Sequence, residues 1–243
     1  NLEAAWNKGF SGQGEVVGMA DTGLDSGDMQ TLHKDLSNTI DASSVTFLPF
    51  TWADSNGHGT HVAGSIQGTG VMSNGLIRGP AYNAQFVAQA IMLPFGGMLD
   101  PMALQDPKKT VGVAAGKNAR VHSNSWGADA KGAYDAMAAA YDQFTWDNPD
   151  VLVVFANGNS GTDANSDGRV DEGSVGSPAT AKNVLSVGAS ENFLSVGGIQ
   201  APVNKLKVAD QFKAEPLASD LLSNNPNGLA VFSILICRTS QFR

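Results

Sequence analysis

The sequence predicts a single α/β domain, in which a doubly wound, mainly parallel β-sheet is flanked by helices. Short apolar runs, typical of buried strands, alternate along the chain with segments of helical periodicity. The length of 243 residues fits one such domain and suffices for a substantial core. Asp21, Ser125 and Asn159 each lie at or just beyond the end of a predicted strand, where the functional residues of such sheets gather.

Individual strands and helices are predicted from apolar runs and their periodicity. The strands are expected at residues 15–20, 44–48, 85–92, 119–124, 151–156 and 183–189. The helices are expected at residues 58–68, over part of 101–116 and at 131–146. The run at 151–156 is rich in β-branched residues without alternation, which is typical of a strand covered on both faces. Asn56 is the expected cap of the helix that begins near His58.

Charge and composition exclude several classes of function. The net charge is −8 and the pI is near 4.8, without a run of Lys and Arg, which argues against binding to nucleic acid. No stretch of about eighteen apolar residues occurs, so no transmembrane helix and no membrane partner are expected. Cys237 is the only cysteine, which rules out a disulfide within the chain. The chain opens at Asn1 without a signal peptide, as expected of a mature or excised piece.

The stretch Asn56–Gly64 contains a histidine in a setting that suits acid–base chemistry. It places His58 between two glycines, where a loop becomes a helix rich in small residues. Glycine adds no Cβ, so the imidazole stays unobstructed, and this setting suits a general base better than a core histidine. Asp21 is the expected carboxylate that orients the imidazole and stabilises its cation. Asn159, in a loop loosened by Gly158, is the expected side-chain donor to an oxyanion.

Five segments together resemble the subtilisin family of serine proteases. They are Ala20–Asp25, Asn56–Gly64, Val154–Gly161, Ser177–Thr180 and Asn183–Ala189. The resemblance covers roughly residues 1–232, whereas the tail at residues 233–243 does not resemble the family. Several loops are closest to the alkaline, oxidant-resistant bacterial branch. The resemblance implies a secreted, extracellular endopeptidase, expected as a monomer, that cleaves extended polypeptides through an acyl-enzyme and whose folding its own propeptide assists.

The same resemblance implies roles for individual residues. Asp21 and His58 match the catalytic aspartate and histidine, and Asn159 matches the oxyanion asparagine. The substrate-binding residues that it implies are Ser125, Trp126, Gly127 and Gly158. An Asp-Thr-Gly turn or a loop asparagine is common by itself, so the support for these roles comes from their order in the chain. A tryptophan such as Trp126 is more often a core or rim residue than a specificity residue, so no pocket is assigned from it.

The sequence lacks the segment in which the family carries its nucleophile. No Gly-Thr-Ser-Met-Ala stretch occurs, and Ser240, within Arg238–Gln241, follows no glycine and precedes no helix. We therefore expect an incomplete catalytic domain whose missing C-terminal part leaves apolar sheet surface exposed. The alternative is a pseudoprotease or peptide-binding module without chemistry. A nucleotide-binding domain is discounted, because the glycines at residues 12–18 precede a strand instead of following it.

An acidic loop follows Asn159 in the sequence. Its oxygen-bearing residues Asp163, Asn165 and Asp167 alternate and precede a glycine, as in the first half of a calcium-binding EF-hand loop. Asp171 fits the ninth position of such a loop, but a serine stands where the bidentate glutamate belongs. A structural Ca²⁺ ion and an acidic, solvated turn are therefore both open. No catalytic cofactor is expected.

Overall fold

The computed structural model describes residues 2–48, 50–95, 97–191, 193–194 and 199–233. Contacts divide the chain into two compact units. Unit 1 comprises Asn1–Ser125, Ala139–Val154 and Asn183–Leu185, and unit 2 comprises Trp126–Ala138, Phe155–Lys182 and Ser186–Arg243. The predicted peptidase domain, residues 1–232, includes parts of both units. Apart from Ser233, the predicted aberrant tail, with Cys237 and Ser240, lies outside the described residues.

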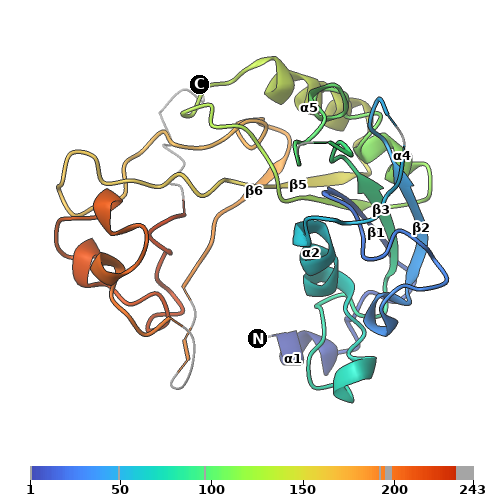
Figure 1. Ribbon diagram of the computed structural model, residues 1–243, viewed down its shortest axis with the longest axis horizontal. Coiled ribbons are helices and arrows are strands. Elements are labelled where there is room, and N and C mark those ends of the chain that lie inside the picture. The colour runs from blue at the N-terminus through green and yellow to red at the C-terminus, as the bar shows by residue number, and fades with distance from the viewer. Residues whose placement is uncertain (1, 49, 96, 192, 195–198, 234–243) are drawn as a thin grey trace. The chain divides into compact units, whose positions relative to one another are not determined.

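Among the described residues, six strands form one sheet in the order β2-β3-β1-β4-β5-β6 (Figure 1). Their bounds are Val16–Asp21 (β1), Thr39–Ser44 (β2), Gln85–Ala90 (β3), Val121–Asn124 (β4), Leu152–Ala156 (β5) and Leu185–Val187 (β6). The pairs β1–β3, β1–β4 and β2–β3 are parallel. The chain adds strands first on one side of β1 and then on the other, which confirms the predicted doubly wound α/β fold.

Helices and short turns connect these strands. The α-helices are Leu2–Trp6 (α1), His58–Gln67 (α2), Pro101–Leu104 (α3), Val111–Ala115 (α4) and Ala136–Asp147 (α5). The 3₁₀ helices are Lys34–Leu36 (η1), Val71–Ser73 (η2), Val203–Lys205 (η3), Ala209–Gln211 (η4) and Leu217–Ser219 (η5). None of the helices in the described part of the chain has the length and apolarity that crossing a bilayer requires.

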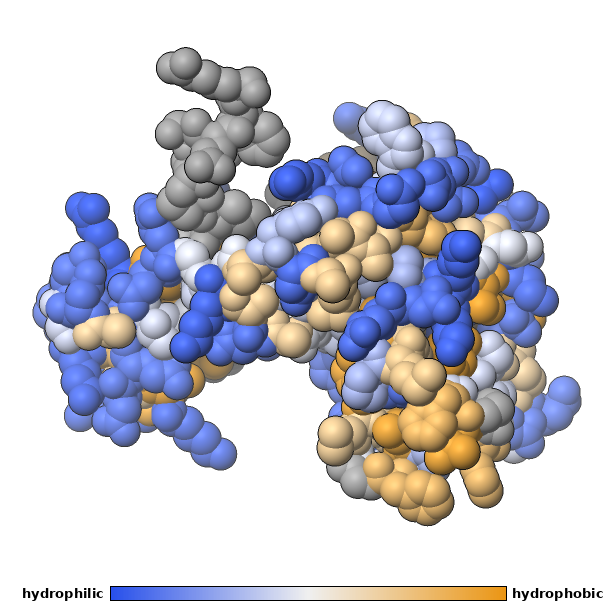
Figure 2. Space-filling view, turned by 90° about the horizontal axis from the view of Figure 1, so that it is seen from above, coloured by the Kyte–Doolittle hydropathy of each residue, from blue (hydrophilic) through white to orange (hydrophobic). Residues whose placement is uncertain are grey.

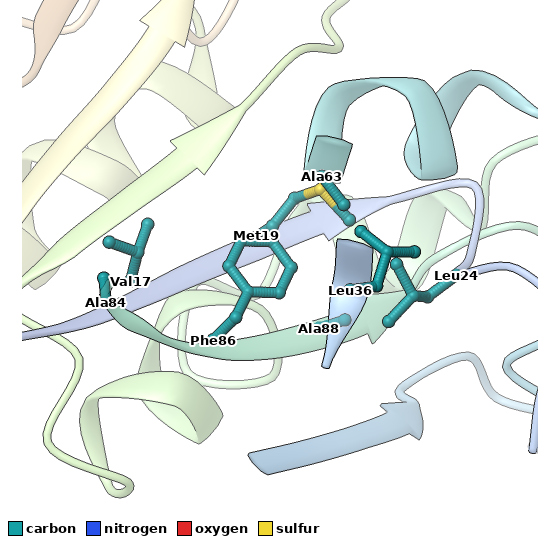
Figure 3. Close-up of a cluster of buried hydrophobic side chains, with 8 residues drawn as sticks. All are labelled: Val17, Met19, Leu24, Leu36, Ala63, Ala84, Phe86 and Ala88. Carbon is teal, nitrogen blue, oxygen red and sulfur yellow. The ribbon is translucent and has the colours of Figure 1, made fainter. Parts of the chain in front are cut away.

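Different helices cover the two faces of the central strands β1 and β3. On one face, Phe86 of β3 packs in a cluster that includes Ala63 of α2 (Figure 3). On the opposite face, Val87 packs in a cluster with Ala114 of α4. Gly18 of β1 allows this second helix to approach, because a Cβ there would lie 2.6 Å from the Ala114 Cβ. Since successive side chains alternate between two covered faces, β1 is buried along its whole length.

The neighbouring strands β4 and β5 have one open face. Buried residues alternate along them with more exposed ones, and Val121 and Leu152 are 39% and 45% exposed. Val121 lies in register with Val17, which belongs to the cluster that α2 covers. A hollow of about 430 Å³ opens on this face and is lined by Val17, Val121 and Val154. The open face is therefore a continuation of the face that α2 covers on β1.

This open face corrects one expectation and fulfils another. The prediction that both faces of the strand at 151–156 are covered is wrong, because the cover that α2 gives to β1 does not extend to Leu152. The predicted exposure of apolar sheet surface is observed at Val121 and Leu152. Figure 2 shows that hydrophobic residues, drawn in orange, reach the surface on one face of the molecule.

The first edge strand lies elsewhere than predicted. The sequence indicates a strand at 44–48, whereas β2 covers Thr39–Ser44. It pairs with β3 with a shift in register between Thr39 and Asp41. Most residues of β2 are only partly buried, so its sequence needs no apolar run, and a prediction based on apolar runs passes over it.

Two predicted helices are shorter than expected. The helix predicted at 131–146 begins only at Ala136, because the preceding turn contains Gly132 with a left-handed φ of 75°. The helix predicted over part of 101–116 is two short helices, α3 and α4. Pro107, which lies between them, has no backbone N–H to continue a helix.

Candidate active site

Asp21 and His58 come from separate elements and meet in unit 1. Asp21 is the last residue of β1 and His58 the first of α2. The distance between His58 Nδ1 and Asp21 Oδ1 is 2.7 Å. The side chain of Asp21 is 2% exposed and that of His58 is 49% exposed. When Nδ1–H donates to the carboxylate, Nε2 carries the lone pair that accepts a proton from another molecule or group.

The charge of Asp21 depends on its hydrogen bonds. Burial raises the pKa of this carboxyl above its usual value, because the charged form loses contact with water. The hydrogen bond from His58 opposes that effect on the pKa, as does the one from the Thr22 backbone N–H, whose length is 2.7 Å. Within the described residues, Asp21 Oδ2 is buried without a hydrogen-bond partner. The carboxylate therefore relies on its Oδ1 donors to stay ionised.

The glycines beside His58 allow this close approach. Gly57 occupies the cap position of α2 with a φ of 91°, in the left-handed region that favours glycine. A Cβ on Gly59 would overlap the carbonyl oxygen of Gly23 and lie 3.2 Å from the Asp21 Cβ. The first turn of α2 thus passes too close to the loop after β1 to carry a side chain at this position.

The predicted cap of α2 is corrected by the structure. Gly57, not Asn56, holds the cap position, and it makes no side-chain capping bond. Asn56 Oδ1 instead accepts a hydrogen bond of 3.3 Å from the His58 backbone N–H. Asp54, which precedes the helix, accepts a hydrogen bond of 2.8 Å from the Thr60 backbone N–H. It thereby satisfies one of the backbone N–H groups that have no partner within the helix. Asp54 is not among the predicted site residues, although a carboxylate just before a helix start is a recognisable signal.

Asn159 lies in unit 2, in the loop that follows β5. Gly158 has a φ of 113°, which turns the chain out of the strand. The preceding Asn157 donates its N–H to Val187 O at 2.9 Å and accepts from the Gly176 N–H at 3.0 Å. Asn159 itself is exposed. The loop is thus anchored two residues before Asn159, whose side chain is open to solvent.

A polar pocket of about 430 Å³ in unit 2 includes Asn159 in its lining. Its charged lining residues include Lys131, Asp171 and Glu172. Asn159 therefore lines a pocket that carries both signs of charge.

The predicted substrate-binding segment begins in unit 1 with Ser125 and continues in unit 2 with Trp126 and Gly127. Trp126 is 7% exposed and packs edge-on against Phe155, with ring centroids 5.1 Å apart. This packing supports the core interpretation of Trp126. Gly127 is exposed, and a Cβ there would lie 2.9 Å from Ser177 O. Substrate contact by this segment stays a prediction.

The acidic loop is folded around its own backbone amides. Asp163 accepts hydrogen bonds from the N–H groups of Asp167 and Gly168, at 2.9 and 3.0 Å. Asp171 accepts one from the Ala164 N–H at 2.7 Å. In the part of the chain that the structure describes, no group of three or more His, Cys, Asp or Glu side chains is placed to hold a metal ion. The calcium site therefore stays a prediction.

Several known proteins are similar to this chain in sequence. An alkaline protease of Alkalihalobacillus alcalophilus is 33% identical over 190 residues, which are 77% of this chain and 42% of that protein. Subtilisin Savinase of Lederbergia lenta is 32% identical over 190 residues, 77% of this chain and 60% of that protein. A serine protease/ABC transporter B family protein (tagA) of Dictyostelium discoideum is 28% identical, and the match spans 10% of its length.

Solved structures show the same fold. The S41 psychrophilic protease superposes with a TM-score of 0.57 at 24% identity, covering 82% of this chain and 62% of that one. The prenylagaramide maturation protease PagA gives a TM-score of 0.54 at 21% identity, covering 79% and 59%. The family model described as the Subtilase family matches residues 12–234. The chain therefore belongs to the subtilase family.

Proposed function

We propose that this chain supplies the general base of a serine-type endopeptidase, with His58 in that role and Asp21 as its orienting carboxylate. The observation that carries the proposal is the 2.7 Å contact between a buried carboxylate and a half-exposed imidazole. Such a pair holds one imidazole tautomer and stabilises the imidazolium that forms when Nε2 accepts a proton.

In this mechanism a serine hydroxyl gives its proton to His58 Nε2 while its oxygen bonds to the carbonyl carbon of a peptide. The tetrahedral intermediate carries a negative oxygen, to which the Asn159 amide is proposed to donate. The carbon–nitrogen bond then breaks, and His58 returns the proton to the leaving amine. Water, deprotonated by the same imidazole, hydrolyses the acyl-enzyme that remains.

The mechanism requires a nucleophilic serine outside the 243 printed residues, because these contain no Gly-Thr-Ser-Met-Ala stretch. Family membership supports polypeptides as substrates, a propeptide as folding partner, a monomer and an extracellular location, all of which are part of the proposal. The matched segment spans 60% or less of the curated relatives named above. The activity proposed is therefore that of a longer protein containing this chain.

A fluorophosphonate probe tests this proposal. We expect no serine of the 243-residue chain to be labelled, because its sequence lacks the Gly-Thr-Ser-Met-Ala stretch that carries the family's nucleophile. Protein made from the complete coding sequence should be labelled at one serine and should lose labelling in His58→Ala. The matched control is His33→Ala, since His33 is also largely exposed, at 54% of its side chain, and should leave labelling intact. Labelling at Ser240 would contradict the proposal.

A second candidate function is a pseudoprotease that binds peptides without cleaving them. The absence of the nucleophile motif from the printed sequence favours it. Sequencing the gene beyond Phe232 separates the two candidates. A reading frame that continues into a serine-bearing segment supports the endopeptidase, whereas an in-frame stop after Arg243 supports the pseudoprotease.

A structural calcium ion in the acidic loop is a further part of the proposal. If Ca²⁺ binds only the folded chain, a concentration of 100 times Kd stabilises it by about 2.7 kcal/mol. We therefore expect a chelator to lower the thermal midpoint and Ca²⁺ to restore it, with Asp163→Asn abolishing the response. Asp28→Asn, in an exposed loop, is the control. A thermal midpoint that neither the chelator nor Ca²⁺ changes would establish the solvated-turn alternative.

A further inference from the structure

Asp54 lies between the two segments that carry Asp21 and His58. Its Oδ1 accepts hydrogen bonds from the Thr22 hydroxyl at 2.8 Å and the Gly57 N–H at 2.9 Å. Its Oδ2 accepts from the Thr60 N–H at 2.8 Å and the Thr60 hydroxyl at 2.6 Å. The carboxylate of Asp54 thus binds both segments. Its Oδ1 binds Thr22, the residue after Asp21, and both of its oxygens bind the start of α2.

The two threonine hydroxyls extend this contact in a crossed pattern. Thr22 Oγ1 donates to Asp54 and accepts from the Gly59 N–H of α2 at 2.8 Å. Thr60 Oγ1 donates to Asp54 and accepts from the Asp25 N–H of the loop after β1 at 2.8 Å. Each segment therefore supplies a hydroxyl that takes an amide proton from the other segment. Asp54 sets the direction of both hydroxyls, because it can only accept.

Backbone contacts fix Asp54 in this place. The Asp54 N–H donates to Asp25 O at 3.0 Å, and the Leu24 N–H donates to Trp52 O at 2.9 Å. A Cβ on Gly23 would lie 2.8 Å from Trp52 O, so the two loops are in direct contact. The carboxylate is consequently attached to a loop that is itself paired with the segment following Asp21.

The chemistry of the site requires Asp54 to be ionised, since each of its partners is a donor. Burial would raise the pKa of this carboxyl, but the hydrogen bonds from Thr60, Gly57 and Thr22 outweigh that effect and lower it. A negative charge at the start of α2 also interacts favourably with the helix dipole. Thr22 and Thr60 therefore keep their acceptor throughout the neutral pH range.

We propose that Asp54 is a positioning residue, whose carboxylate aligns Thr22 and Thr60 so that His58 Nδ1 meets Asp21 Oδ1. Asp21 and His58 are the immediate neighbours of Thr22 and Gly59, the two residues joined by the first crossed bond. A shift of this bond moves the partners of the 2.7 Å contact directly. The inference rests on the proposed function for its catalytic meaning, but the geometry it concerns is present in the chain itself.

Asp54→Asn is the informative substitution. It keeps an acceptor for Thr22 and Gly57 but turns an NH₂ group toward the N–H and hydroxyl of Thr60. Thr60→Val removes only the hydroxyl, and Thr60→Ser retains it. Asp28→Asn is the control for loss of a carboxylate from an exposed loop.

The first readout is the Nδ1 proton of His58, followed by NMR in the 243-residue chain. We expect a slowly exchanging, downfield resonance in the unchanged chain, in Thr60→Ser and in Asp28→Asn. The resonance should be lost or broadened in Asp54→Asn and Thr60→Val. The double variant Asp54→Asn/Thr60→Val should be no worse than the singles, because both act on one contact.

The second readout is peptide hydrolysis by protein made from the complete coding sequence. Asp54→Asn should lower kcat by up to about 10²-fold, the effect of misplacing a catalytic group, while KM changes little. If Asp54→Asn lowers the thermal midpoint but leaves the His58 Nδ1 resonance unchanged, Asp54 acts only as a helix cap. That result would overturn the inference. If the resonance is lost but no form of the protein hydrolyses peptides, the positioning role stands and the proposed function fails.

Discussion

Asp21→Asn should lower kcat for peptide hydrolysis by about 10⁴-fold in protein made from the complete coding sequence. This magnitude is taken over from the same residue's loss in the chymotrypsin and subtilisin triads and does not come from the present geometry. The physical reason lies in the 2.7 Å contact with His58 Nδ1. An asparagine there offers either a neutral oxygen or an NH₂ group, and the latter would hold the imidazole in the wrong tautomer.

The same substitution should change KM little, because Asp21 is 2% exposed and has no surface for substrate to touch. Steady-state kinetics on an extended peptide give both constants. Asp28→Asn serves as the matched control, since it makes the same chemical change in an exposed loop. Equal kcat values in the two variants would contradict the assignment of Asp21.

Acid should destabilise the chain through His122, which is fully buried in β4. Its Nε2 lies 3.2 Å from Gln89 Oε1, in a space that Gly18 leaves free by having no side chain. Burial lowers the pKa of His122 to about 3, and the hydrogen bond with Asn124 opposes that effect. The imidazole therefore stays neutral in the folded chain at pH values where the unfolded chain has already protonated it.

The sign of this effect follows from proton linkage. Below pH 6.5 the unfolded state binds a proton that the folded state does not, so the free energy of unfolding falls as the pH falls. The free energy of unfolding therefore falls by several kcal/mol, progressively between about pH 6.5 and pH 3. This loss is a large part of the stability of a typical domain.

Urea denaturation at a series of pH values measures this loss. His122→Gln cannot be protonated, so its stability should depend less on pH by the stated amount, even if its stability at pH 7 is lower. Carboxyl groups such as Asp21 and Asp54 titrate in both proteins, so the difference between the two curves isolates His122. His33→Gln changes a largely exposed histidine and should leave the curve of the unchanged chain intact. Parallel curves for His122→Gln and the unchanged chain would refute the prediction.

Much of the fold could be predicted from the sequence, because buried strands leave a local signal. β1 and β3 are apolar runs with both faces covered, and α2 begins at the expected residue, His58. Which strands carry the open face could not be predicted, since exposure depends on which helix packs where. A run of β-branched residues has the same sequence pattern whether one face or both faces of its strand are covered.

The residues of the candidate site also differ in how far the sequence predicts them. Asp21, His58 and Asn159 stand in recognisable motifs whose chain order identifies them. Asp54 carries no such motif, and its importance comes from donors that lie up to 32 residues away along the chain, as Thr22 does. Side-chain hydrogen bonds at such separations leave no periodic trace in the sequence.

Residue types at local spacings in the sequence predict the family, the doubly wound fold and the candidate acid–base pair. The tertiary structure is needed to show that Asp21 is buried against a half-exposed His58 and that Asp54 joins their segments through crossed threonine bonds. It also decided that His122 is sealed inside the sheet. Burial and long-range hydrogen bonding set the charge of each of these groups, and both arise only when distant segments pack together.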